Sequence, residues 1–376
     1  MERDELYQEH IAEMFGRHVI EEYSDEDILR VLKRLISCLP NGGKLYKYRP
    51  IKGQTFDYAY DALKNGYIWL STADQFNDDE DCTLFFTPET EAEALKEYLY
   101  SHIDVVIKRI AYLIRKGEYD APACTADVLK CFDKTTGRIK KKKAVNSLVK
   151  QGYNKADSQR FVNETQKITD DFFSKNSDGI NGIVNDFLHF NQNNRSKSYV
   201  YSLSETYDTD TMWAYYADSN KGFCIEYNFS KALLLPPEAR RLLISTYKVI
   251  YKETKEPFSF IHILDYILQG QQDTQEFQKV NYEMLTRMIT KRAEWQTEKE
   301  WRIYLYNVQN RLNADLVSGI IIDERIIDTK KAKKLIVLSK ERGWSLTVRG
   351  RNIIQTAHKY VPYEEWKRRK QDNARS

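Results

Sequence analysis

The chain has 376 residues with 58 Lys and Arg against 55 Asp and Glu, and its net charge of +3 argues against the strong overall positive field of a dedicated nucleic-acid binder. Hydrophobic residues make up 41%, enough for a packed core, yet no stretch reaches the roughly 18 to 20 apolar residues of a membrane-spanning helix. The N-terminal residues lack the apolar segment of a signal peptide, and the five cysteines form no C-x-x-C pair. We therefore expect a cytoplasmic protein with reduced cysteines and no membrane association.

Helical and strand-like patterns follow one another along the first half of the chain. Residues 1–43 are predicted to form an N-terminal helical segment, because apolar residues recur there at helical spacing. Residues 44–87 are predicted to begin an α/β core, with a strand that carries Arg49, a helix that stops at an Asn-Gly turn, and a β-rich run before an acidic turn. Residues 88–195 have a helical, charged pattern and are interpreted as a helical insertion.

The second half alternates in the same way. Residues 196–230 are predicted to add core strands and a short helix, and residues 231–292 a helical segment with one candidate strand at 247–251. Residues 293–350 form the C-terminal part of the core, and residues 351–376 form a C-terminal segment with a basic tail. Because helical blocks separate the strands, the sheet must be assembled from distant pieces, and a site on it would be composite.

The sharpest motif is Glu298-Lys299-Glu300-Trp301-Arg302. Side chains alternate faces along a strand, so Glu298, Glu300 and Arg302 would share one face, with about 6.6 Å between successive positions. Both carboxylates could then address one ligand, by stabilising a developing cation or with one of them acting as a general base. The alternative is an exposed strand face that carries a Glu-Arg ion pair.

A second motif is Tyr46-Lys47-Tyr48-Arg49. Arginine offers a planar charged fork that binds carboxylate or phosphate through two hydrogen bonds, and the flanking tyrosines can stack on a flat ring. The alternative is an edge strand with a surface arginine.

A third motif begins where Ser71 and Thr72 end a β-rich run. Four residues of interest follow in and around the acidic turn: Phe76, Asn77, Asp78 and Asp81. Hydroxyl groups at a strand end can hold a polar ligand group, and the turn's side-chain oxygens could bind a cation such as magnesium. The alternative is a turn capped by short polar side chains.

A fourth motif is Ser202-Leu203-Ser204-Glu205 followed by Met212 to Ala217. Trp213 and Tyr216 in it would share a helix face three residues apart and could form the wall of a pocket, or pack in the core. The six histidines are scattered, and the chain contains no Walker loop, G-x-G-x-x-G, G-x-S-x-G or H-E-x-x-H motif. A carboxylate mechanism is therefore favoured over one based on histidine. The basic runs 138–143 and 367–370 could contact phosphate or form a solvated surface.

Several of these segments resemble the bacterial family known as domain of unknown function 2971. The resemblance spans about residues 45–325 without the helical insertions, and its matching pieces include Tyr46 to Arg49, Phe76 to Asp78, Ser202 to Tyr227 and Glu298 to Arg302. This family name implies no activity.

The order of Arg49, Ser71-Thr72 and the Glu298-x-Glu300 motif also resembles ADP-ribosyltransferases of the arginine, serine, glutamate type. The resemblance implies an α+β fold with a split, mostly antiparallel β-core that binds NAD, with no metal. It assigns NAD anchoring to Arg49, support of the site to Ser71, stabilisation of the ribosyl cation to Glu300 and contact with the acceptor to Glu298.

The leading hypothesis is therefore NAD-dependent ADP-ribosyl transfer or NAD cleavage, as in a bacterial toxin or antiphage effector. The predicted NAD contacts come from all four motifs: Tyr46, Lys47, Tyr48, Arg49, Ser71, Thr72, Phe76, Asn77, Trp213, Tyr216 and Arg302. The acceptor would be a protein or nucleic acid, and the helical insertion could hold a partner or regulatory protein. Two alternatives stay open. One is a magnesium-dependent nuclease or phosphoesterase with ligands among Asp78, Asp81, Glu298 and Glu300; the other is a non-catalytic module that senses a nucleotide or binds a protein.

Overall fold

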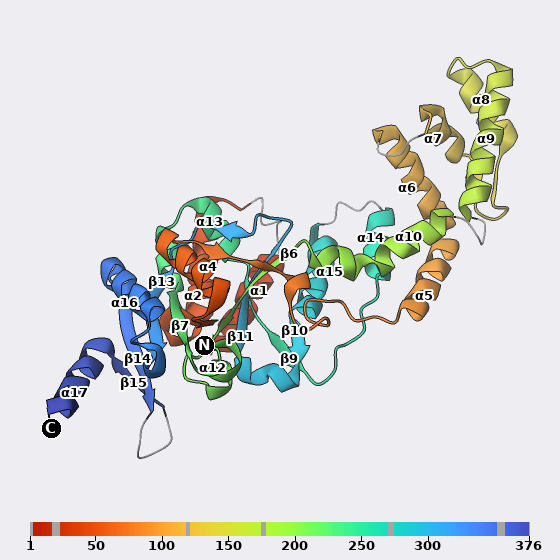
Figure 1. Cartoon of the computed structure of the whole chain (residues 1–376). Helices are drawn as coiled ribbons and strands as arrows, with labels where there is room; N and C mark the ends of the chain where they lie inside the picture. Colours follow the sequence, from red (N-terminus) through yellow and green to blue (C-terminus); the bar gives the residue numbers. More distant parts are fainter. Residues whose placement is uncertain are drawn as a thin grey trace. The chain divides into compact units, whose positions relative to one another are not determined.

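The computed structural model describes residues 3–16, 23–117, 121–173, 178–269, 274–351 and 358–375. The chain divides into two compact units (Figure 1). Unit 1 consists of Met1–Thr83, Asn194–Lys255 and Asn281–Ser376, and unit 2 consists of Leu84–Asn193 and Glu256–Val280. The helical insertion expected at 88–195 thus falls largely in unit 2, which also takes in part of the expected helical segment 231–292.

Unit 1 is built on a nine-stranded sheet with the strand order β15-β14-β13-β7-β1-β6-β11-β8, and β3 pairs with β6. Its strands are β1 (Lys44–Pro50), β3 (Ser71–Thr72), β6 (Ser198–Ser204), β7 (Gly222–Asn228), β8 (Thr246–Lys248), β11 (Glu300–Tyr306), β13 (Val317–Asp323), β14 (Ser345–Arg351) and β15 (His358–Pro362). Neighbouring strands are antiparallel apart from β13 and β14, which are parallel and are connected through the helix α16 (Lys330–Arg342). The fold is therefore mixed α and β with a mostly antiparallel, open sheet.

Strands β1 and β6 share fewer register pairs than any other two neighbouring strands described in this sheet. Strand β1 pairs with β7 along its whole length, from Lys44 to Pro50, and β6 pairs with β11 along its whole length. Between β1 and β6, however, the one register pair is Tyr46 with Ser204. The two strands therefore diverge beyond this pair, and the sheet opens between them.

Helices cover one face of the sheet and form the main core with it. In α2 (Asp25–Cys38) the buried residues Ile28, Val31, Leu32 and Leu35 recur at helical spacing, and they belong to one cluster with strand residues such as Trp301. Ser24 precedes the helix as its N-cap and forms a capping box with Asp27. The helices α1 (Arg3–Gly16), α4 (Gly53–Asn65), α13 (Pro237–Leu243) and α16 contribute to the same core.

The opposite face carries a smaller cluster beneath α12 (Asp210–Tyr216). Tyr46 and Tyr48 of β1 lie in it with Trp213, because alternate residues of a strand point to opposite faces. Unit 1 also contains α3 (Pro40–Gly43), β2 (Ile68–Trp69), β9 (Ile250–Lys252), β10 (Thr290–Arg292), β12 (Arg311–Leu312) and α17 (Tyr363–Arg375). The helix α15 (Thr274–Met288) has residues in both units.

The prediction of one continuous strand at 247–251 is wrong. The structure has two short strands there, β8 and β9, which pair in different sheets. They separate at Val249, whose backbone N–H donates to the Glu300 carbonyl at 2.9 Å. The extended segment 246–252 therefore contributes strands to two sheets, and the hydrogen bond from Val249 to the first residue of β11 lies between them.

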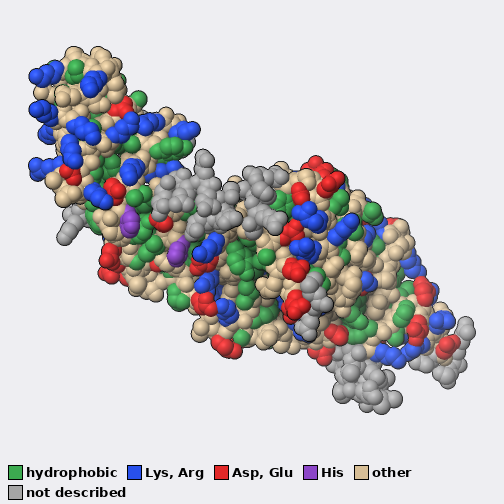
Figure 2. All heavy atoms as spheres, turned by 180° about the vertical axis from the view of Figure 1, so that it is seen from behind, with side chains coloured by type: hydrophobic (Ala, Val, Ile, Leu, Met, Phe, Trp, Pro, Cys, Tyr) green, Lys and Arg blue, Asp and Glu red, His purple; other side chains and the backbone are tan. Residues whose placement is uncertain are grey.

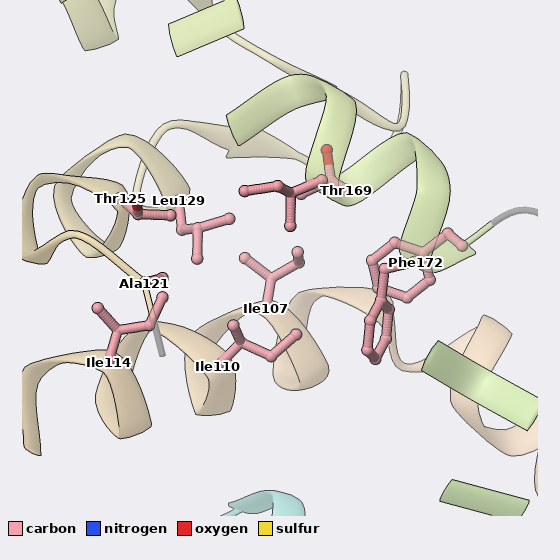
Figure 3. A pocket seen from close by; sticks show the side chains of 10 residues that line it. Ile107, Ile110, Ile114, Ala121, Thr125, Leu129, Thr169 and Phe172 are labelled. Atoms are coloured by element: carbon pink, nitrogen blue, oxygen red, sulfur yellow. The ribbon is translucent and has the colours of Figure 1, made fainter. Parts of the chain in front are cut away.

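Unit 2 is helical. It contains α5 (Pro88–Ser101), α6 (Ile103–Lys116), α7 (Ala123–Leu129), α8 (Lys141–Lys150), α9 (Lys155–Phe173), α10 (Asp178–Leu188), α14 (Ile261–Gln269), most of α11 (Phe190–Arg195) and the hairpin strands β4 (Phe132–Asp133) and β5 (Arg138–Ile139). Figure 3 shows apolar side chains of α6, such as Ile107 and Ile110, facing Thr169 and Phe172 of α9 across a gap of about 20 Å³. A gap of this size with apolar walls is a packing void, too small for a cofactor.

None of the helices in the described ranges is long and apolar enough to cross a bilayer. All five cysteines are buried and free.

Candidate functional site

A pocket of about 710 Å³ opens in unit 1 where β1 and β6 diverge. Its walls are formed by residues 46–50 of β1, 202–204 of β6, Met212, Tyr215 and Tyr216 of α12, Asp218, the turn residues 75–78 with Asp81, and Lys291, Trp295, Glu298 and Glu300. This volume lies within the range of about 300 to 1,000 Å³ that is typical of small-molecule sites.

Strand β1 supplies two cations to one wall. The Lys47 Nζ donates to the Ser202 carbonyl at 2.6 Å and lies 4.7 Å from the centre of the Tyr201 ring. Burial, together with the charge of Arg49, lowers the pKa of Lys47 to about 7. The Lys47 side chain thus connects β1 to β6 just beyond Tyr46 and Ser204, where the backbone pairing of the two strands has ended.

Arg49 completes this cationic wall. Its guanidinium carbon is 5.9 Å from the centre of the Tyr201 ring, and its buried Nε has no hydrogen-bond partner among the described residues. Neither Arg49 nor Lys47 forms an ion pair with a carboxylate within the described part of the chain. Two cations without a protein counter-ion favour an anionic group of a ligand at this wall.

Carboxylates and two further cations form a buried network at the other side of the pocket. The Lys291 Nζ donates to Glu298 Oε2 at 2.6 Å and to Glu300 Oε2 at 3.3 Å. The Arg302 guanidinium binds both oxygens of Asp81 at 2.8 Å, and it binds Glu300 through Nε at 2.7 Å and through Nη2 at 3.0 Å. Arg302 is fully buried, and the three carboxylates are each 5% exposed.

The charges of this network do not cancel. With all groups ionised, three carboxylates face two cations, which leaves one negative charge. Burial pushes the pKa of Glu300 upward, but Arg302 and Lys291 more than offset this effect and hold its pKa well below the ordinary value. Burial and the charge of Glu300 raise the pKa of Glu298, although Lys291 opposes this shift. Glu300 is thus the permanent anion, and Glu298 is the carboxylate better suited to exchange a proton.

Hydroxyl groups orient Glu298. The Tyr216 hydroxyl donates to Glu298 Oε1 at 2.5 Å, and burial with the nearby Glu298 charge raises the pKa of Tyr216, so this donor keeps its proton. The Ser204 hydroxyl donates to the Glu298 carbonyl at 2.8 Å.

The two glutamates reach the pocket by different routes. The interpretation that both lie on one strand is wrong, because β11 begins at Glu300 and Glu298 ends a 3-10 turn. Lys299 between them has a φ of 44°, in the left-handed region, and this reverses the alternation expected of a strand. Trp301, Ile303 and Leu305 of β11 are buried in the main core, as their spacing predicts.

Most of the residues predicted to contact a ligand line this pocket. They are Tyr46, Lys47, Tyr48, Arg49, Phe76, Asn77, Tyr216, Glu298 and Glu300. Arg302 lies behind Glu300, and Ser71 and Thr72 pair with Val200 and Tyr199 of β6, so these three are not among the residues that form its walls.

Trp213 is also not among the residues that line the pocket. It is fully buried, its Nε1 donates to the Tyr207 carbonyl at 2.7 Å, and the Arg349 guanidinium carbon lies 4.6 Å from its ring centre. It therefore packs in the core beneath α12, whereas Tyr216, at the end of that helix, reaches the pocket.

Sequence reasoning missed Lys291 as part of the site, and it singled out the motif of Ser202 and Ser204 without assigning either serine a ligand contact. The two serines carry a signal in the sequence, because they alternate along a strand-like run, and in the structure Ser204 is the register partner of Glu300 and Ser202 that of Arg302. Lys291 carries no such signal, since it is positioned by the three-residue strand β10, which pairs with the sequence-distant β9.

The acidic turn contributes a charge partner to the network. Asp81 is buried against Arg302, while Asp78 and Asn77 line the pocket. In the ranges that the structure describes, no group of three or more His, Cys, Asp or Glu side chains is arranged to hold a metal ion.

Comparison with known proteins adds one match. No curated protein and no solved structure matches the chain. Residues 212–303 match the family model described as protein of unknown function (DUF2971). The match contains Tyr216, Lys291, Glu298, Glu300 and Arg302, so the segment that resembles this family supplies two of the three carboxylates on the acidic side of the pocket, whereas Asp81 lies outside it.

Proposed function

We propose that this pocket binds NAD and cleaves its bond between nicotinamide and ribose, transferring ADP-ribose to an acceptor or to water. The observation that carries the proposal is that one pocket holds Arg49 and Lys47, neither of which forms an ion pair in the described ranges, together with a network of net negative charge. The charges of NAD are complementary to those of the two sides of the pocket, because its pyrophosphate is anionic and its ribose becomes cationic as nicotinamide leaves.

The cationic wall would bind the pyrophosphate. Arginine binds phosphate oxygens through two parallel hydrogen bonds, and the Nε of Arg49 is available for such a bond. Lys47 adds a second charge when it is protonated. Tyr46 and Tyr48 belong to the smaller core cluster and fix the course of β1 around these cations.

The acidic side would act on the reacting ribose. As the C1′–N bond breaks, its electron pair goes to the nicotinamide ring and positive charge develops on the ribose, which Glu300 stabilises. The acceptor's nucleophilic atom then bonds to C1′, and Glu298 accepts the proton that this atom loses. Arg302 and Lys291 keep Glu300 ionised throughout, and the negative charge left over in the network provides the stabilisation.

Nicotinamide release from NAD tests this proposal. The purified protein is incubated with NAD and with protein and nucleic-acid acceptors, and nicotinamide is measured by chromatography. We expect Glu300→Gln to lower the rate by about 100-fold or more, as for loss of a transition-state charge partner. Glu294→Gln is the matched control, because Glu294 is exposed and lies outside the pocket walls. Absence of release with every acceptor, or an unchanged rate in Glu300→Gln, would refute the proposal.

One observation favours a second candidate, a nucleotide-binding module without turnover. Both oxygens of Glu300 already accept hydrogen bonds from Arg302. A module of this kind would bind NAD or ADP-ribose, and Arg49→Ala would weaken the binding while no nicotinamide is released. The magnesium-dependent alternative has less support, since Asp81 and Glu300 would have to leave Arg302 to bind a cation. Release that persists in EDTA would distinguish the NAD proposal from it.

A further inference from the structure

The helical part of unit 2 from α6 to α9 is strongly basic. Between residues 103 and 173 the chain has fifteen Lys and Arg against nine Asp and Glu, although the whole chain is nearly neutral. Lys and Arg side chains gather in Figure 2 over the part of unit 2 that carries α7, α8 and α9 in Figure 1. The charge is thus concentrated on one folded part of the chain.

The local fold determines which side chains are exposed in the most basic segment, residues 138–143. Ile139 at the end of the β4–β5 hairpin is buried, and its N–H donates to Gln166 Oε1 of α9 at 2.6 Å. Ala144 and Leu148 of α8 are fully buried as well. With these apolar residues facing inward, five basic residues around them are exposed, namely Arg138, Lys140, Lys141, Lys142 and Lys143. We refer to these five as the α8 basic surface.

The position of these lysines is unfavourable for the helix itself. Lys140 is the N-cap residue of α8 and Lys141, Lys142 and Lys143 form its first turn, which contains no acidic residue. The N-terminus of a helix carries partial positive charge and favours anions, so lysines there repel both the helix dipole and one another. The sequence places three lysines at the end of the helix that least accommodates them.

The protein neutralises little of this charge. Lys140 lies 3.3 Å from Asp133, and Lys141 donates to the amide oxygen of Asn163 at 3.0 Å. Arg138, Lys142 and Lys143 form no ion pair with any carboxylate in the described ranges. An external polyanion would supply the missing counter-charges.

We propose that the α8 basic surface binds the phosphate backbone of a nucleic acid. Exposed cations without protein partners release counter-ions when they contact phosphates, which drives such binding. A membrane surface is less suitable, because an interfacial helix presents a continuous apolar face outward, whereas α8 buries Ala144 and Leu148 and exposes a single large apolar side chain, Val149.

Fluorescence anisotropy tests this surface in the full-length protein without NAD, so the outcome is independent of the pocket in unit 1. Labelled single- and double-stranded DNA and RNA of about 20 nucleotides are titrated at several salt concentrations. For Lys142→Ala/Lys143→Ala we expect Kd to rise about tenfold or more, and the slope of log Kd against log salt to shrink by about 1.4 to 1.8, since each lost phosphate contact contributes about 0.7 to 0.9.

Two control variants separate this surface from general charge. Lys367→Ala/Arg368→Ala removes the same charge from exposed positions of α17 and should leave Kd unchanged. Lys142→Arg/Lys143→Arg keeps the charge and should bind as the wild type does. The proposal is overturned if the wild type binds no nucleic acid at low salt, if the α17 variant loses as much affinity, or if the protein binds anionic vesicles but no nucleic acid.

Discussion

Replacing Arg302 by methionine removes the cation that holds the acidic network together. Arg302 is fully buried and makes four charge-assisted hydrogen bonds, two to Asp81 and two to Glu300. Its loss leaves three buried carboxylates facing Lys291 alone. Removing one partner of a buried ion pair typically costs about 3 to 5 kcal/mol, because the other charge stays desolvated. We expect the free energy of unfolding of Arg302→Met to fall by about that amount at neutral pH.

The cost should depend on pH in a defined direction. Arg302 and Lys291 hold the pKa of Glu300 well below its ordinary value of 4.5, so this carboxylate stabilises the wild type above pH 4.5 and loses its effect as the pH falls through the lower, folded-state pKa. In Arg302→Met the pKa of Glu300 rises and most of that stabilisation is absent at every pH. The difference between the two proteins should therefore be largest at neutral pH and narrow below pH 4.5.

The chain offers a selective probe for this measurement. All six tryptophans, at positions 69, 213, 295, 301, 344 and 366, lie in the segments of unit 1, so urea unfolding followed by tryptophan emission reports that unit. Arg30→Met is the control, because Arg30 also contacts two carboxylates but its side chain is 56% exposed, and exposed ion pairs contribute little. A cost for Arg302→Met below about 1 kcal/mol, or one that is equal at pH 7 and pH 4, would refute the reasoning.

Three further predictions concern the pocket and the core. Because the pKa of Lys47 is about 7, affinity for NAD measured by calorimetry should fall as the pH rises from 6 to 8, and Lys47→Arg should abolish this dependence; an equal slope in both proteins would contradict the assignment. A Cβ atom at Gly222 would lie 2.3 Å from the Arg49 carbonyl oxygen, so Gly222→Ala should shift β1, cost about 1 to 3 kcal/mol and weaken NAD binding, whereas Gly182→Ala serves as a control, because a Cβ atom at Gly182 would meet open space. Leu32 is fully buried in α2, so Leu32→Ala should lower the free energy of unfolding by about 2 to 5 kcal/mol in tryptophan-monitored urea titrations, while Lys33→Ala on the exposed face should have little effect.

Local pattern was sufficient to predict much of the fold. The helical spacing in α2, the Asn-Gly stop after α4 and the alternation in β11 follow from side-chain periodicity and turn chemistry, which act over a few residues. The break between β8 and β9 was not predictable in this way. It depends on a hydrogen bond from Val249 to Glu300, about fifty positions later in the chain.

The same distinction applies to the pocket. Arg49, Glu298 and Glu300 could be selected from residue type and spacing, and they do line one cavity. The left-handed residue Lys299 was not foreseen, because the backbone there is determined by how the turn meets β11. Lys291 could not be foreseen either, since its charge reaches the glutamates through the tertiary packing of a three-residue strand.

The single register pair between β1 and β6 has a mechanical consequence for the sheet. Lys47 and Arg49 belong to the portion that runs from β15 to β1, whereas Glu300 and Arg302 belong to the portion that runs from β6 to β8. A ligand bound to both portions would connect β1 to β6 across the pocket, where the two strands form no backbone hydrogen bonds beyond their single register pair. Ligand binding in the pocket and the rigidity of the sheet are therefore coupled. Backbone amide protons of β1 and β6 next to the pocket would exchange more slowly when a ligand is bound.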